Sequence, residues 1–247
     1  MKILLVGASG AMGKVICQII EEHEDIEIVA GISGKDYQED FPVYSEFENI
    51  EEDFDCIIDF SNSSLTSSLL DFIEISGKRA VIATTDLSED LKDRMKEISK
   101  TIPIFYSQNT SIGVNLINNI VGYLARVLTD FDIEIIEKHH NTKVDAPSGS
   151  AEMFFDSIKE YRKDAYEVYD RTKEHKKRDK NEVGISSIRG GTIVGEHSVI
   201  FAGIDEVVEI KHIPGSKRIF ANGAIKAAKF LMTKNSGFYN MEDVLNE

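Results

Sequence analysis

The chain has 247 residues, a hydrophobic content of 42% and a formal net charge of −15 at pH 7. This size suffices for one large domain or two modest domains with real cores. The acidic charge argues against a nucleic-acid partner, which requires a basic face, and no apolar run approaches the length of a membrane span. The N-terminal apolar run is cut off at Gly7, so we expect no signal peptide and a cytoplasmic protein.

The first half of the chain alternates short apolar runs with segments of helical spacing. Strands are predicted at Ile3–Val6, Ile26–Ile32, Phe54–Phe60, Ala80–Ala83 and Ile102–Tyr106. Helices are predicted around residues 15–20, 65–73 and 87–98. Such alternation predicts a parallel sheet covered by helices, which binds ligands beyond the carboxyl ends of its strands.

A glycine-rich segment joins the first predicted strand to the first predicted helix. Gly7, Gly10 and Gly13 form a G-x-x-G-x-x-G pattern, a variant of the commoner G-x-G-x-x-G dinucleotide fingerprint. Glycines let the backbone turn tightly and approach a pyrophosphate, and the helix N-terminus stabilises the negative charge. The alternative is a glycine-rich turn that binds no ligand.

The residues after the second predicted strand bear on the choice of dinucleotide. Ser33, Gly34 and Lys35 stand where an acidic side chain would bind the ribose 2′-OH of NAD. Lys35 favours NADPH, because a cation tolerates a 2′-phosphate, although it can also be an ordinary exposed loop lysine. Two polar segments, Ala83–Thr85 and Ser107–Thr110, end strands where a nicotinamide would reach, and each alone is typical of an ordinary loop.

The second half has a different pattern. After a helix near Leu116–Leu128, strands are predicted at Phe131–Ile135, Val183–Ile188, Val199–Ala202 and Val207–Ile213, with one helix at Ala151–Tyr161. A final helix at Phe220–Leu231 is expected to return to the first domain, and Lys173–Lys180 is expected to be a solvated loop. The predicted fold class is α/β, a Rossmann-like doubly wound parallel sheet with a second, smaller α+β substrate domain.

The run Glu137–Ala151 concentrates the candidate chemistry. His139, His140 and Lys143 precede a Pro-Ser-Gly-Ser turn that opens a helix. Histidine delivers a proton near neutral pH, lysine holds a carboxylate, and a helix N-terminus binds anions. Structural histidines are the alternative, because neighbours on a strand point to opposite faces. We expect no metal, since adjacent histidines are too close to share one and no Cys or acidic ligand follows at familiar spacing.

The sequence resembles the 4-hydroxy-tetrahydrodipicolinate reductase (dihydrodipicolinate reductase) family almost end to end. The matching segments are His139–Ala151, Gly7–Gly13, Ala83–Thr85, Asn109 with Ser111 and Gly113, Ile188–His197, and Phe220–Ala224. The resemblance implies a dinucleotide-binding domain at 1–110 plus 221–247 and a substrate-binding and oligomerisation domain at 111–220. It also implies a homotetramer assembled through the substrate-domain sheets.

The resemblance also implies a reaction: NAD(P)H-dependent reduction of 4-hydroxy-tetrahydrodipicolinate, via dihydrodipicolinate, to tetrahydrodipicolinate in diaminopimelate and lysine biosynthesis. By likeness, His139 is the proton donor/acceptor and Lys143 a second donor, while His140, Gly149 and Ser150 hold the small dicarboxylate substrate. The implied dinucleotide residues are Gly7, Ala8, Ser9, Gly10, Ala11, Met12, Ala83, Thr84, Thr85, Ser107, Gln108, Asn109 and Thr110.

Both NADPH and NADH are expected to serve, with NADPH modestly favoured, since Ser33 replaces the acidic residue of some members. Ser150 stands where threonine is usual and keeps the hydroxyl, and Ile213-Pro214-Gly215 departs from the family pattern. The alternative functions are an NAD(P)-dependent dehydrogenase of another small carboxylic acid and a non-catalytic dinucleotide sensor. A sensor needs no proton donor, so the histidine–lysine cluster favours an enzyme.

Overall fold

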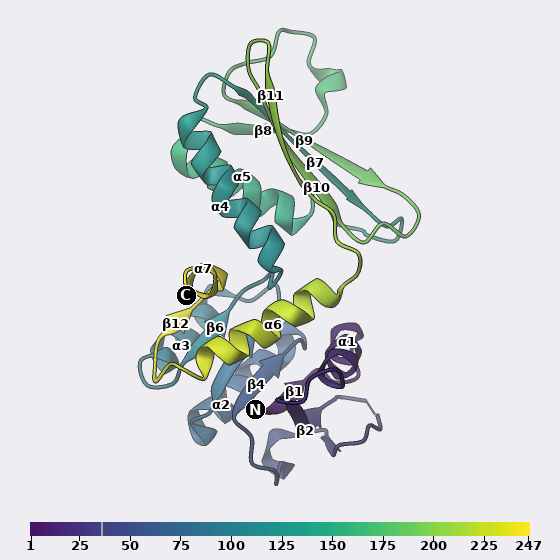
Figure 1. Ribbon diagram of the computed structural model, residues 1–247, viewed down its shortest axis with the longest axis vertical. Helices are drawn as coiled ribbons and strands as arrows, with labels where there is room; N and C mark the ends of the chain where they lie inside the picture. Colours follow the sequence, from purple (N-terminus) through teal and green to yellow (C-terminus); the bar gives the residue numbers. More distant parts are fainter. Residues whose placement is uncertain (36) are drawn as a thin grey trace. The chain divides into compact units, whose positions relative to one another are not determined.

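The computed structural model describes residues 1–35 and 37–247, which divide into two compact units (Figure 1). The first unit combines Met1–Ile112 with Lys217–Glu247, and the second is Gly113–Ser216. The sequence-based boundaries lay at 110/111 and 220/221, a few residues from these divisions. Both ends of the chain therefore belong to the first unit.

No helix in the described part of the chain combines the length and the apolarity needed to cross a membrane.

The first unit contains a seven-stranded sheet in the order β12-β6-β5-β4-β1-β2-β3, in which every neighbouring pair is parallel. The strands are β1 (Lys2–Val6), β2 (Glu27–Ile32), β3 (Val43–Tyr44), β4 (Cys56–Asp59), β5 (Arg79–Ile82), β6 (Ile104–Tyr106) and β12 (Phe238–Tyr239). The five predicted strands are confirmed. The edge strands β3 and β12 were missed, because two residues are too few to show a pattern.

Helices cover both faces of this sheet. The cluster on one face draws on α1 (Ala11–Ile20), α6 (Arg218–Leu231) and α7 (Met241–Leu245). The cluster on the other face draws on α2 (Thr66–Ser76) and α3 (Glu89–Ser99), with the short 3-10 helices η1 (Phe47–Asn49) and η2 (Ser63–Leu65) nearby in sequence. Successive residues of β1 alternate between the two clusters, as a strand buried on both faces requires. The doubly wound, Rossmann-like architecture is confirmed.

The second unit has a mixed five-stranded sheet in the order β11-β10-β7-β9-β8. The strands are β7 (Asp132–His139), β8 (Tyr166–Val168), β9 (Glu182–Arg189), β10 (Glu196–Ala202) and β11 (Val207–His212). Helices α4 (Ile112–Val127) and α5 (Gly149–Tyr161) pack on one face, around the fully buried Phe154 and Phe201. This arrangement confirms the smaller α+β unit.

The predicted end of strand β7 was wrong. We placed it at Ile135, because the apolar–polar alternation breaks at Ile136, but the strand continues to His139. Polar side chains at Glu137 and His139 continue the two-residue alternation, and a hydrophobicity pattern does not register them. The longer strand matters because it carries the first candidate histidine on a rigid element.

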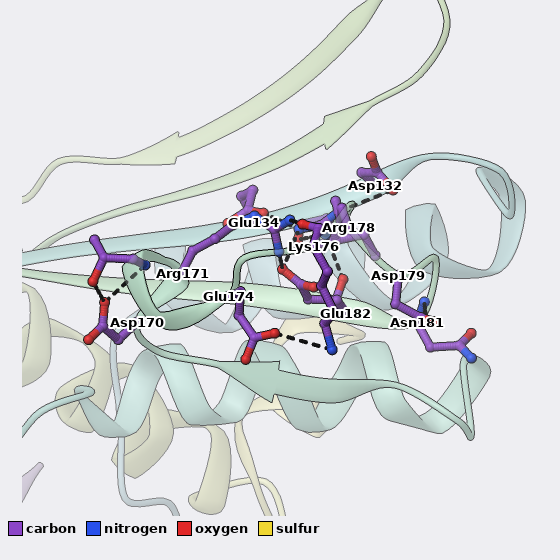
Figure 2. Close-up of polar contacts among 12 residues, drawn as sticks. Asp132, Glu134, Asp170, Arg171, Glu174, Lys176, Arg178, Asp179, Asn181 and Glu182 are labelled. Carbon is purple, nitrogen blue, oxygen red and sulfur yellow. Dashed lines mark hydrogen bonds and ion pairs between the residues drawn. The ribbon is translucent and has the colours of Figure 1, made fainter.

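The expectation of a solvated loop at Lys173–Lys180 was also wrong at Arg178. Figure 2 shows its guanidinium among the carboxylates of Asp132, Glu134 and Glu182. Nε lies 3.2 Å from Asp132 Oδ1, and only 17% of the Arg178 side chain is exposed. Arg171, in the 3-10 helix η3 (Arg171–Lys173), also pairs with Glu182. The buried Glu182 carboxylate needs cationic partners, so it draws this segment onto the sheet.

Candidate active site

At one end of the helix-covered face of the second sheet, the side chains change from apolar to polar. Residues Ile133, Ile135, Glu137 and His139 share one face of β7, because side chains alternate along a strand. The apolar pair lies in the core, and the polar pair follows it. Register places Ser187 of β9 and His197 of β10 on either side of Glu137, and Arg189 of β9 beside His139. The end of a buried sheet face thus becomes a cluster of titratable groups.

His139 is tied to a buried carboxylate. Its Nδ1 lies 2.6 Å from Oε2 of Glu137, which is fully buried. Arg189 holds the same carboxylate with both terminal nitrogens, at 2.8 Å from Oε2 and 2.7 Å from Oε1. Burial alone would raise the pKa of Glu137, but hydrogen bonds from Arg189, Ser187 and His139 outweigh it and bring that pKa to about 2. Burial lowers the pKa of His139, and Glu137 only partly offsets this effect.

A second, unpredicted histidine stands behind His139. The His197 ring lies edge-on to the His139 ring, with centroids 5.3 Å apart, and is 5% exposed. Its Nε2 is 2.9 Å from Oγ of Ser148. Ser148 is the N-cap residue of α5, and its hydroxyl accepts a hydrogen bond from the Ala151 N–H. Burial, followed by the neighbouring His139, lowers the pKa of His197 to about 4. A neutral His197 therefore supports the turn that opens α5.

The loop between β7 and α5 brings the other candidate substrate residues close to this cluster. Lys143 Nζ lies 2.6 and 2.8 Å from the Asp145 carboxylate oxygens, and the Asp145 carbonyl accepts from Arg189 at 2.6 Å. His140 points its Nδ1 to Thr142 Oγ1 at 2.6 Å. A Cβ built on Gly149 meets no heavy atom within 4 Å, so the first turn of α5 is open there. An ammonium and a helix N-terminus together suit an anionic ligand.

The glycine loop of the first unit fits a dinucleotide. Gly7 has φ +86°, and a Cβ there would lie 2.7 Å from the Phe60 carbonyl oxygen. A Cβ on Gly13 would lie 2.4 Å from the carbonyl oxygens of Gly7 and Ala8, so neither position admits another residue. Gly10 caps α1 without a side-chain hydrogen bond, which leaves the helix N-terminus to an anion such as pyrophosphate.

The serine at the end of β2 is engaged with this loop. Ser33 Oγ lies 2.7 Å from Ser9 Oγ and is bound by the Lys35 backbone N–H at 3.1 Å. Ser33 is buried, while Lys35 is exposed. The described residues at this turn thus present a hydroxyl and an exposed ammonium where other nucleotide-binding folds present a carboxylate.

A buried carboxylate that we did not predict ends β4. Asp59 is fully buried, accepts from Thr84 Oγ1 at 2.7 Å, and accepts from the Ser61 N–H at 2.9 Å. Burial raises its pKa despite these hydrogen bonds. The sequence does contain a signal for this residue, because Asp59 is an acidic residue directly after the apolar run of β4. Thr84, a predicted dinucleotide residue, is oriented by this contact.

The segment after β6 is held by its own hydrogen bonds. Ser107 Oγ donates to the Asn109 carbonyl at 2.8 Å, and the Ser111 N–H donates to Asn109 Oδ1 at 3.0 Å. The Thr110 hydroxyl donates to the Phe220 carbonyl at the start of α6, at 2.7 Å. Thr110 is 1% exposed, so its side chain serves the fold of the first unit. This segment and Ala83–Thr85 leave β6 and β5 at the same edge of the parallel sheet as the glycine loop.

The predicted residues therefore form two groups. All the predicted dinucleotide residues lie in the first unit, and His139, His140, Lys143, Gly149 and Ser150 lie in the second. Sequence reasoning assigned no role to four partners of these residues, namely Asp59, Glu137, Arg189 and His197, and it saw Ser148 only as part of the anion-binding turn.

Comparisons with known proteins agree with these features. The model of the dihydrodipicolinate reductase N-terminus matches residues 1–110, and that of the C-terminus matches residues 113–245. A curated 4-hydroxy-tetrahydrodipicolinate reductase from Caldanaerobacter subterraneus subsp. tengcongensis is 45% identical over 250 residues, covering 100% of this chain and 98% of the relative. The reductase of that name from Staphylococcus carnosus is 44% identical over 250 residues, with 100% of both chains covered.

A solved structure supports the fold. The dipicolinate-bound dihydrodipicolinate reductase from Paenisporosarcina sp. TG-14 superimposes with a TM-score of 0.84 at 21% identity, covering 99% of each chain. The resemblance noted in the sequence is confirmed, since two family models together span almost the whole chain. The chain belongs to the dihydrodipicolinate reductase family.

Proposed function

We propose that the chain catalyses the NAD(P)H-dependent reduction of 4-hydroxy-tetrahydrodipicolinate, via dihydrodipicolinate, to tetrahydrodipicolinate in the diaminopimelate and lysine pathway. The full-length likeness to curated reductases of that name supports this reaction. The observation that carries the chemistry is His139, which lies at the end of the core face beside the loop of Lys143 and the first turn of α5. That combination supplies a proton donor and positive charge for a dicarboxylate.

The residues proposed to bind and protonate the substrate all lie in the second unit. Loss of water from the substrate gives a cyclic imine that carries two carboxylates, and reduction at C4 leaves an enamine that needs a proton at C3. His139 is the proposed proton donor, with Lys143 as a second donor. His140, Gly149 and Ser150 are proposed to hold the carboxylates, because the start of α5 offers backbone N–H groups and the preceding loop offers the Lys143 ammonium.

The residues proposed to bind the dinucleotide all lie in the first unit. When bound, the reduced nicotinamide supplies the hydride. Residues 7–12, 83–85 and 107–110 are proposed to hold the dinucleotide, since the Gly7 and Gly13 backbones fit a close approach to pyrophosphate. Both NADPH and NADH are proposed to serve. NADPH is modestly favoured because Ser33 introduces no carboxylate and Lys35 is exposed beside it.

We further propose a homotetramer assembled through the sheets of the second unit. The face of that sheet opposite α4 and α5 carries exposed apolar side chains, such as Ile188 at 45% and Val207 at 63% exposure. Sedimentation velocity of the purified protein tests this assembly, and a monomer at micromolar concentration would contradict it. We also propose a cytoplasmic location, since Cys17 and Cys56 are both free thiols, as is usual in reducing compartments.

A coupled assay tests the reaction. The upstream synthase, pyruvate and aspartate semialdehyde generate the substrate in place, and oxidation of NADPH or NADH is followed by its absorbance. We expect oxidation that requires the synthase and both of its substrates, with tetrahydrodipicolinate identified by mass. Absence of synthase-dependent oxidation, or oxidation supported by an unrelated small keto acid alone, would favour a different dehydrogenase.

A further inference from the structure

Glu137 is placed to act on His139. It lies two residues before His139 on the same face of β7, and its carboxylate is fully buried. Its Oε2 faces His139 Nδ1 at 2.6 Å, and Arg189 grips both oxygens from the neighbouring strand. A carboxylate held this way has little freedom to rotate away from the imidazole.

This contact determines which ring nitrogen of His139 carries a proton. The ionised Glu137 carboxylate only accepts hydrogen bonds, so the nitrogen facing it must be Nδ1–H. In the neutral ring Nε2 is then the unprotonated nitrogen. Nε2 lies against Gly195, where a Cβ would come within 2.9 Å of it, so the glycine leaves room for the ring in this orientation. The proton donated to a ligand would therefore leave from Nε2.

We infer that Glu137, clamped by Arg189, is a positioning residue that fixes the Nδ1–H tautomer of His139 and stabilises its imidazolium. The inference rests on the proposed function, in which His139 is the proton donor. In the donating step the Nε2–H bond breaks and a C3–H bond forms on the enamine. His139 is left neutral with its proton on Nδ1, and a proton from solvent restores the imidazolium.

The charges around His139 make such a partner necessary. Burial lowers the pKa of His139, and the positive charges of Lys143 in the following loop and Arg189 on β9 lower it further. The His197 ring lies edge-on to the His139 ring. Glu137 is the acidic side chain that the structure places in contact with the ring, so it is the group that favours the imidazolium.

Arg189 has a second consequence for the site. The nitrogen that binds Glu137 Oε1 also donates to the Asp145 carbonyl at 2.6 Å, and the Asp145 side chain binds Lys143. One guanidinium therefore fixes both the carboxylate behind His139 and the loop of Lys143. Arg189→Lys loses the two-nitrogen fork that binds both oxygens of Glu137.

Nitrogen NMR of the histidine side chains tests the tautomer without any activity. In protein labelled with ¹⁵N-histidine, we expect His139 above its pKa to show a protonated Nδ1 and an unprotonated Nε2, with the resonance assigned by its loss in His139→Gln. In Glu137→Gln we expect mixed tautomers, because an amide can either accept or donate. A wild-type His139 protonated on Nε2, or an unchanged tautomer in Glu137→Gln, would overturn the inference.

Kinetics test the effect on the proposed reaction. We expect Glu137→Gln to lower kcat by about 10²–10⁴-fold, the range typical of a disturbed general acid and its orienting carboxylate. The alkaline limb of the kcat profile should move to lower pH, because the imidazolium loses its counter-charge. KM for the dinucleotide should change little. A fall in kcat with an unmoved limb would show a merely structural role.

Matched variants separate the possible failures. Glu196→Gln makes the same change on β10, where Glu196 pairs with Lys138, and should alter neither the tautomer nor the alkaline limb. If Glu137→Gln does not fold, Glu137→Asp keeps the charge but withdraws it from the ring, and it should still lower kcat. Unchanged kcat in Glu137→Asp would also overturn the inference. An inactive wild type with the expected tautomer would refute the proposed reaction and leave the tautomer assignment standing.

Discussion

Thr84 Oγ1 donates a hydrogen bond to Asp59 Oδ2 at 2.7 Å, between the carboxyl ends of the neighbouring strands β5 and β4. Asp59 is fully buried and its second oxygen accepts from the Ser61 N–H. The contact orients a proposed dinucleotide residue through an acidic group that burial makes costly to ionise. Asp59 therefore orients the site, but its ionised form lowers the stability of the fold.

We expect Asp59→Asn to fold. Its free energy of unfolding should increase relative to that of wild type as pH rises. The pKa of Asp59 is raised by burial, so its stabilisation is complete below the unfolded value near 3.9 and is lost as pH rises through the folded value. An asparagine carries no charge; its Oδ1 can accept from the Ser61 N–H, and its Nδ2 can donate to Thr84 Oγ1, which then becomes the acceptor. Urea unfolding across pH measures this difference. Asp53→Asn, at an exposed position, is the control, and a difference that does not depend on pH would contradict the prediction.

Replacing His139 tests the proposed donor. We expect His139→Gln to lower kcat by about 10²–10⁴-fold, as for loss of a general acid. Affinity for NAD(P)H should barely change, because the proposed dinucleotide residues lie in the other unit. Steady-state kinetics and dinucleotide titration give the two quantities. A variant with near-wild-type kcat would remove His139 from the mechanism.

Lys143 is proposed to bind a substrate carboxylate, with Asp145 holding its ammonium in the loop. We expect Lys143→Ala to impair substrate capture and turnover together. Binding of pyridine-2,6-dicarboxylate should weaken by about 10- to 100-fold, the size of a hydrogen bond to a charged group. Inhibition constants measure this change. Lys163→Ala, an exposed lysine just beyond α5, is the control, and equal inhibition of both variants would show that Lys143 does not touch the ligand.

The choice of dinucleotide depends on the turn after β2. We expect wild type to use both dinucleotides, with NADPH favoured by about 1 kcal/mol at low salt, the scale of an exposed charge pair. Rising ionic strength should narrow this preference. Lys35→Ala should reduce it, and the exposed Lys226→Ala should not. The ratio of kcat/KM for NADPH to kcat/KM for NADH measures the preference. A strong NADH preference in wild type would contradict the role proposed for Lys35.

His197 should make the fold sensitive to acid. Burial lowers its pKa to about 4, so its contribution to stability is complete above about pH 6.5 and is lost as pH falls towards 4. The loss is on the order of 3 kcal/mol. We expect His197→Asn to flatten the unfolding free energy over this pH range, with the exposed His175→Asn as control. Parallel curves for wild type and His197→Asn would contradict the prediction.

The sequence by itself determined most of the elements and the chemistry-bearing segments, but not the short strands β3, β8 and β12. Apolar runs alternating with helical spacing predicted the five inner strands of the first sheet, because burial on both faces leaves an unbroken apolar pattern. The glycines at 7, 10 and 13 and the run His139–Ser150 marked both candidate sites, because tight turns and proton transfer require particular residue types. Family resemblance then added roles that no pattern supplies.

Only the tertiary structure decided which side chains meet. Glu137 and Arg189 are 52 residues apart, Ser148 and His197 are 49 apart, and Asp59 and Thr84 are 25 apart. Each pair forms because two segments adopt one register or packing, and a shift of one residue along a strand would turn its side chain to the opposite face. Composition and local spacing do not contain that register. The partners that orient His139, cap α5 and fix Thr84 therefore appear only once the sheets are assembled.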